Sequence, residues 1–129
     1  TRFTLGLFPS EDARNAMWAE RHREKAGILT ALKSQGLLPA GVSEDPAQVP
    51  IMTTELMEGI HQYLARTPAW MVLANIDDVI GTRVQANLPG TVDQHPNWCR
   101  KLSLPVEELA QDSRFERLAA LLRLTRPLV

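Results

Sequence analysis

Residues Trp70–Ile76 read WMVLANI, a short and nearly unbroken apolar run. Polar and apolar residues do not alternate in it, which is typical of a strand covered on both faces, as in the parallel sheets of α/β proteins. A single strand cannot satisfy its own backbone donors and acceptors, and no second segment resembles a strand equally well. The sequence therefore predicts one buried strand whose neighbours in the sheet lie outside this chain.

Helical segments are expected before this run. Ser10 can cap a first helix that continues to about Gln35, and Gly36 ends it because glycine accepts the left-handed conformation after a last turn. A second helix starts near Thr53 and carries apolar residues at helical spacing up to Thr67. The density of proline and glycine between these two segments predicts a surface loop.

Helical segments are also expected after the run. Asp77 caps a single turn that Gly81 closes, and Ser113 with Glu116 forms the S-x-x-E capping box of a last helix. Helix, buried strand, long loop and helix follow one another as in one βα unit of a (β/α)8 barrel, where function lies in the loops after the strands. We expect a mainly α fold with one buried strand, in a single unit spanning residues 1–129.

The composition is that of a globular domain with no electrostatic signature. Hydrophobic residues make up 44% and charged residues 22% of the 129 residues, and the net charge is −1. A net charge this close to zero does not indicate a basic surface that would attract nucleic acid or an anionic membrane, so we expect neither partner. No apolar stretch approaches the roughly 20 residues that span a bilayer.

The single cysteine, Cys99, cannot form an intrachain disulfide, which fits a reducing compartment and predicts the cytoplasm. His95 and Cys99 are spaced as two metal ligands could be, but a structural zinc site has four ligands and a catalytic one has three. Cys99 as a nucleophile would have only His95 as a base. We therefore predict neither a metal nor a cofactor.

Polar and aromatic residues gather in the loop after the apolar run, between Gln85 and Leu102. Within it, Asn87–Thr91 reads NLPGT, a tight turn whose glycine permits a ligand to approach the backbone. His95–Trp98 reads HPNW and supplies imidazole, amide and indole groups. These groups can hydrogen-bond hydroxyls and stack on a sugar ring. The alternative is a hydrogen-bonded loop with Trp98 packed in the core.

Adjacent carboxylates occur at Asp77–Asp78, Glu44–Asp45 and Glu107–Glu108. Each pair has an ordinary explanation as a helix cap, a loop acid or a first-turn charge. Asp77 is the best catalytic candidate among them, because it follows the apolar run where barrels place catalytic groups. A cap on the next helical turn explains the same residue equally well.

Two segments carry a resemblance to a known family. NLPGTVDQHPNW at residues 87–98 resembles the region after the last barrel strand of the 4-α-glucanotransferases, the amylomaltase or disproportionating-enzyme family. LGLFPSEDARNAMWAERHREKAGILTALKSQGLLP at residues 5–39 looks like the segment and charged helix before that strand, so the resemblance covers most of the chain. Cys99 stands where the family usually has a basic residue, and Gln94 where an acidic one is common.

The resemblance implies a fold and an activity. It implies the last βα unit and carboxy-terminal helices of a (β/α)8 barrel enzyme that transfers α-1,4-glucan segments to an acceptor sugar with retention of configuration. Retention needs two carboxyl groups about 5 Å apart, and the resemblance places them before Thr1. We therefore expect no catalytic residue in this chain and no activity from the chain alone.

The resemblance also implies roles within the loop. The expected substrate-binding residues are Asn87, Pro89, Gly90 and Thr91. The residues expected to shape the loop are His95, Asn97, Trp98 and Arg100.

The expected partners are an α-1,4-glucan or malto-oligosaccharide and the remainder of the barrel, together with self-association through exposed core residues. The rival interpretation is an autonomous, non-catalytic helical module that binds carbohydrate or protein. Pairing of Met71–Ile76 with strands of this chain would favour the autonomous module. Exposure of the same residues would favour a part of a larger enzyme.

Overall fold

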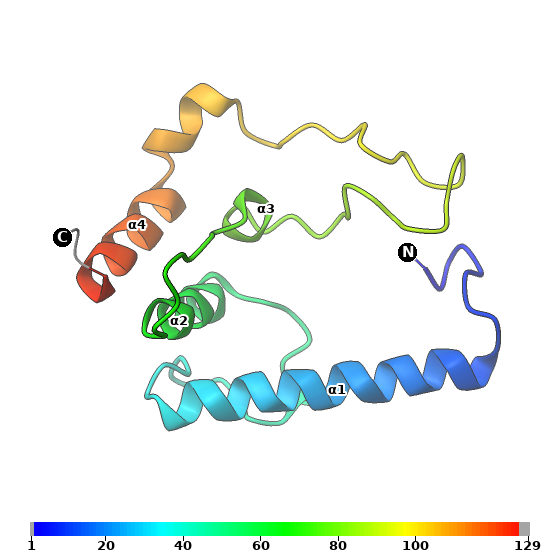
Figure 1. Cartoon of the computed structure of the whole chain (residues 1–129), viewed down its shortest axis with the longest axis horizontal. Helices are drawn as coiled ribbons and strands as arrows, with labels where there is room; N and C mark the ends of the chain where they lie inside the picture. The colour runs from blue at the N-terminus through cyan, green and yellow to red at the C-terminus, as the bar shows by residue number, and fades with distance from the viewer. Residues whose placement is uncertain (1, 127–129) are drawn as a thin grey trace.

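The computed structural model describes residues 2–126. Four α-helices and two short 3-10 helices follow in the order α1 (Glu11–Ser34), η1 (Pro46–Gln48), α2 (Thr54–Ala65), α3 (Ile76–Val79), η2 (Val106–Gln111) and α4 (Ser113–Thr125). In Figure 1, α2 lies beside the carboxy-terminal half of α1, and α3 and α4 pack against α2. Within residues 2–126, no helix is long and apolar enough to cross a membrane.

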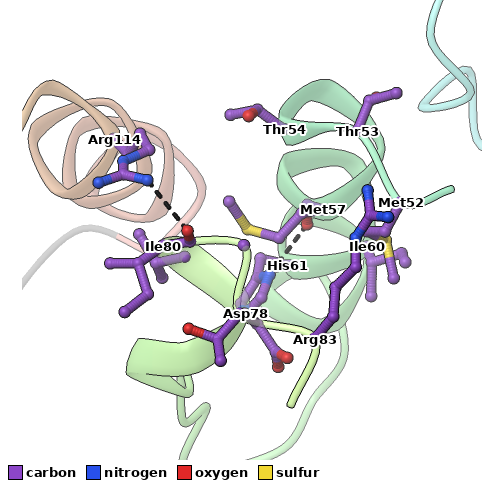
Figure 2. Close-up of a pocket in the computed structure, with 13 residues that line it drawn as sticks. Met52, Thr53, Thr54, Met57, Ile60, His61, Asp78, Ile80, Arg83 and Arg114 are labelled. Carbon is purple, nitrogen blue, oxygen red and sulfur yellow. Dashed lines mark hydrogen bonds between the residues drawn. The ribbon is translucent and has the colours of Figure 1, made fainter. Parts of the chain in front are cut away.

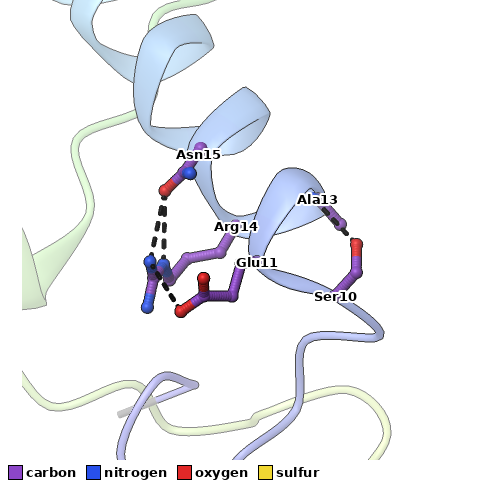
Figure 3. Close-up of polar contacts among 5 residues, drawn as sticks. All are labelled: Ser10, Glu11, Ala13, Arg14 and Asn15. Atoms are coloured by element: carbon purple, nitrogen blue, oxygen red, sulfur yellow. Dashed lines mark hydrogen bonds and ion pairs between the residues drawn. The ribbon is translucent and has the colours of Figure 1, made fainter.

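The long helix α1 begins and ends where the sequence predicts. Ser10 Oγ accepts a hydrogen bond from the Ala13 N–H at 3.1 Å, which satisfies one free amide of the first turn (Figure 3). Arg14 reaches Glu11 at 3.5 Å and Asn15 at 3.4 Å on the exposed face of that turn. Gly36, with φ of 64°, follows the last turn and confirms the predicted stop.

Only the carboxy-terminal half of α1 contributes to a hydrophobic core. Leu29 and Leu32 are each 1% exposed and pack with Leu37, Val49 and Leu56 in a first core cluster. Burial of each leucine contributes about 1.5–3 kcal/mol. The first core cluster therefore fixes α2 and the loop before it on this half of α1.

Helix α2 is shared between two cores. Thr53 caps it as expected, since its hydroxyl accepts the Leu56 N–H at 3.2 Å. Leu56 belongs to the first core cluster, whereas the adjacent Met57 packs with Val79 of α3 and Leu118 of α4 in a second core cluster. Two neighbouring residues of α2 thus join α1 to α3 and α4.

The predicted buried strand at Trp70–Ile76 is wrong. Residues 2–126 contain no strand, and the exposed fractions of Trp70, Met71 and Leu73 are 103%, 73% and 79%. A strand exists only when a neighbouring strand pairs with its backbone, and no described segment does so. The carbonyl oxygens of Ala69 and Trp70 instead accept hydrogen bonds from Arg126. This mainly helical chain therefore leaves its most apolar segment uncovered.

Two predicted caps are also displaced. Asn75, not Asp77, caps α3, because the Asn75 carbonyl oxygen Oδ1 accepts the Asp77 N–H at 3.0 Å. Asp112, not Ser113, caps α4, because its carboxylate accepts the Arg114 N–H at 2.9 Å. In both helices the residue with extended backbone lies before the predicted cap, and its side chain accepts from the N–H of the second helical residue.

Candidate functional site

The polar loop, here called the 85–102 loop, connects the turn after α3 with η2. Figure 1 shows it running out from the helices and folding back beside itself. Leu88 is completely buried and His95 is 6% exposed, although most of their neighbours in sequence are exposed. The 85–102 loop therefore has an interior of its own.

Asn97 is the central hydrogen-bonding residue of this loop. Its Oδ1 accepts the Leu88 N–H at 2.8 Å, and its Nδ2 donates to Thr91 O at 3.2 Å and to Thr91 Oγ1 at 3.0 Å. The Thr91 hydroxyl donates to Leu88 O at 2.6 Å. The Asn97 side chain therefore binds both ends of the Leu88–Thr91 turn, and the Thr91 hydroxyl joins the two ends directly.

His95 and Trp98 bind the first residues of the loop. The Gln85 carbonyl oxygen lies 2.9 Å from His95 Nε2, so this nitrogen carries the proton and donates. The backbone N–H of Trp98 donates to Ala86 O at 2.7 Å, and Trp98 has a positive φ of 61°. Its indole is 77% exposed, which contradicts the alternative that Trp98 packs in the core.

The four residues expected to bind substrate lie together on the Asn87–Thr91 turn. Within residues 2–126 the Asn87 amide group makes no hydrogen bond, and Pro89 and Gly90 are exposed. Gly90 has φ of 87°, a conformation that side chains with a Cβ rarely adopt. The Thr91 hydroxyl, in contrast, is occupied by bonds within the loop. Substrate binding by these residues stays a prediction.

Arg100 connects the loop to the helices. Its Nη2 bonds Asp77 Oδ2 in a largely buried ion pair, in which the side chains are 19% and 27% exposed. The hydrogen bond from Arg100 lowers the pKa of the Asp77 carboxyl below its ordinary value. Asp77, the best catalytic candidate in the sequence, is thus an ionised partner of Arg100.

The adjacent pair Glu44–Asp45 also has structural partners. Glu44 pairs with Lys33 of α1, and Asp45 caps η1 by accepting the Ala47 N–H at 2.9 Å. Glu107 and Glu108 are exposed in the first turn of η2. In the described part of the chain, no three His, Cys, Asp or Glu side chains are grouped to hold a metal ion.

A cleft of about 350 Å³, which no sequence pattern predicted, lies where α2, α3 and α4 meet (Figure 2). Met57 and Ile80 give it an apolar lining, and His61, Arg83 and Arg114 give it polar groups. His61 is 6% exposed and its Nδ1 lies 2.9 Å from Met57 O, while Arg114 donates to Ile80 O at 3.0 Å. Its residues come from segments far apart in the sequence, so no local pattern could predict the cleft.

The structure is a helical chain with two exposed features: the Asn87–Thr91 turn, which hydrogen bonds hold in shape, and the apolar segment Trp70–Leu73. Residues 11–106 match the family model described as 4-alpha-glucanotransferase. This match covers more than half of the chain, and the chain belongs to the 4-alpha-glucanotransferase family.

Individual relatives agree with the family match. The chain is 29% identical over 102 residues to a 4-alpha-glucanotransferase of Haemophilus influenzae, an alignment that covers 79% of the chain and 14% of that protein. It is 31% identical over 130 residues to the 4-alpha-glucanotransferases of Mycobacterium bovis and Mycobacterium tuberculosis, covering 95% of the chain and 16% of those proteins. The chain thus spans 14–16% of the length of these relatives.

Proposed function

We propose that this chain is the carboxy-terminal part of a 4-α-glucanotransferase. The complete enzyme transfers α-1,4-glucan segments to an acceptor sugar with retention of configuration. Such chemistry needs a nucleophilic carboxylate and an acid/base carboxylate about 5 Å apart. In this proposal other parts of the enzyme supply both groups, and this chain alone is inactive.

The observation that carries the proposal is the uncovered segment Trp70–Leu73 in a chain that spans 14–16% of its relatives. Exposed apolar runs of this kind mark surfaces that another part of a protein covers. In an autonomous module the same residues would be expected in the module's own core. The exposure therefore favours a part of a larger enzyme, and the remainder of that enzyme is the partner we propose for this segment.

Within the enzyme, the Asn87–Thr91 turn borders the glucan. Asn87 is the strongest candidate because its amide group can both donate to and accept from sugar hydroxyls and is not used within the loop. Pro89 and Gly90 bring an exposed stretch of backbone to the same surface. His95, Asn97, Trp98 and Arg100 shape the loop that presents this turn.

Replacement of Asn87 in the complete enzyme tests the proposal. Asn87→Ala is expected to lower kcat/KM for disproportionation of maltotriose about tenfold, the scale of one or two lost hydrogen bonds. Asn15→Ala, at an exposed position of α1, is the matched control and should leave transfer unchanged. Unchanged transfer by the Asn87→Ala enzyme would remove Asn87 from the glucan site. A wild-type enzyme without transfer activity would overturn the function itself.

A further inference from the structure

Within residues 2–126, a single polar contact joins the 85–102 loop to the rest of the chain. The bonds made by His95, Asn97 and Trp98 all end on other residues of the loop. Only the bond from Arg100 to Asp77 leaves it. The internal bonds therefore fix the shape of the loop, whereas the Asp77–Arg100 ion pair fixes its position.

The anchoring partner lies on a well-packed element. Asp77 is in the first turn of α3, two residues before Val79, which is 3% exposed in the second core cluster. Met57 of α2 and Leu118 of α4 complete this cluster. A displacement of Asp77 would disturb the cluster. The ion pair therefore attaches the loop to a set of three packed helices, α2, α3 and α4.

The two side chains are matched to one another. The bond joins Arg100 Nη2 to Asp77 Oδ2, and the remaining Arg100 Nε and Asp77 Oδ1 are buried without another partner. A guanidinium and a carboxylate can form two parallel hydrogen bonds, so a small adjustment of the same pair satisfies both atoms. The lowered pKa of the Asp77 carboxyl keeps this group ionised near neutral pH.

We propose that Asp77 and Arg100 are positioning residues that hold the Asn87–Thr91 turn in the orientation in which it borders the glucan. The inference rests on the proposed function of this turn. Neither residue touches the reacting atoms. Loss of the pair leaves the chemistry intact and weakens binding, because the turn keeps its internal bonds but loses its fixed place beside the substrate.

A double-mutant cycle in the complete enzyme tests this proposal. Asp77→Asn and Arg100→Gln are each expected to raise KM for maltotriose roughly tenfold, the scale of a lost hydrogen bond between charged groups, with kcat within about twofold of wild type. The double variant should be no worse than either single variant, because both changes remove the same contact. Glu58→Gln, which breaks the Arg117–Glu58 ion pair between α2 and α4, is the matched control and should leave KM unchanged.

Limited trypsin digestion gives a second readout that does not depend on transfer activity. Arg83, an exposed residue just before the loop, should be cleaved faster in both single variants than in wild type or Glu58→Gln. Unchanged KM in an active enzyme, a fall in kcat alone, or additive effects in the double variant would each overturn the positioning role. Unchanged cleavage would overturn the anchor. A wild-type enzyme without transfer would overturn the proposed function, and the digestion would still decide whether the pair anchors the loop.

Discussion

Leu29 and Leu32 of α1 are 1% exposed, and their cluster packs α1, α2 and the loop between them against one another. In the 85–102 loop only Leu88 is completely buried, and a handful of hydrogen bonds centred on Asn97 maintains the turn. The first region excludes water by packing. In the 85–102 loop most residues are exposed, and the shape of the turn depends on hydrogen bonds made by individual side chains.

This difference indicates which region determines stability and which one is available for binding. A buried leucine contributes about 1.5–3 kcal/mol, whereas one hydrogen bond contributes about 0.5–1.5 kcal/mol net. Changes in the helical core should therefore alter unfolding of the whole chain. Changes in the 85–102 loop should alter local opening and, in the complete enzyme, glucan binding.

The largest effect is expected for Leu32→Ala. The substitution leaves a cavity in the first core cluster and should lower the free energy of unfolding by about 3 kcal/mol in urea titrations. Leu73→Ala is the matched control in this chain alone, where the position is 79% exposed, and should change the free energy of unfolding by less than about 0.5 kcal/mol. Equal losses for the two variants would mean that Leu73 is covered in solution.

A smaller loss is expected for Gly59→Ala in α2. A Cβ at this position would lie 2.6 Å from the carbonyl oxygen of Leu37, so the backbone of one segment must move. This strain should exceed the gain of about 1 kcal/mol that alanine normally gives in a helix and should lower the free energy of unfolding by about 1–2 kcal/mol. Gly27→Ala in α1, where nothing lies within 4 Å, should instead stabilise the chain. The same sign for both variants would contradict the close packing of α2.

Asn97→Ala should act on the loop alone. It leaves the Leu88 N–H without its acceptor and removes both bonds to Thr91, at a local cost of about 1 kcal/mol. Hydrogen exchange of the Leu88 amide should become several times faster, while that of amides in α1 stays the same. Faster exchange throughout α1 as well would show that the loop and the helical core unfold together.

The helices that the sequence predicted well are those whose signals are local. Ser10 and Gly36 mark the ends of α1 within a few residues, and Thr53 does the same at the start of α2. The caps of α3 and α4 were predicted too late because Asn75 and Asp112 compete with polar neighbours for the same role. A choice between adjacent capping residues depends on backbone geometry that composition does not specify.

The strand prediction failed because pairing is not a local property. The run Trp70–Ile76 has the composition of a buried strand, but its conformation depends on which segment lies beside it. The Asp77–Arg100 ion pair was missed for a related reason, since its partners are separated by 23 positions in the sequence. The motif residues of the loop could be named from the sequence, but the contact that anchors them could not.

The smallest effect is expected on acidification, at the start of α4. The bonds from the Arg114 side chain and backbone lower the pKa of the Asp112 carboxyl from its ordinary 3.8 to about 2. A carboxyl whose pKa is lower in the folded state stabilises the fold above the unfolded pKa, and this contribution is lost as pH falls from about 4 towards 2. The protection of amides in the first turn of α4, relative to their intrinsic exchange rates at each pH, should fall across this range.

Asp112→Asn separates this effect from acidification of other groups. The variant retains a capping oxygen but cannot titrate, so its first turn in α4 should show little change between about pH 4 and pH 2. Glu55 of α2, whose pKa is also lowered by hydrogen bonds to the backbone and to Thr53, serves as the internal comparison because its surroundings remain acid-sensitive in the same variant. Equal acid sensitivity of α4 in wild type and Asp112→Asn would mean that the Asp112–Arg114 contact does not hold this helix end.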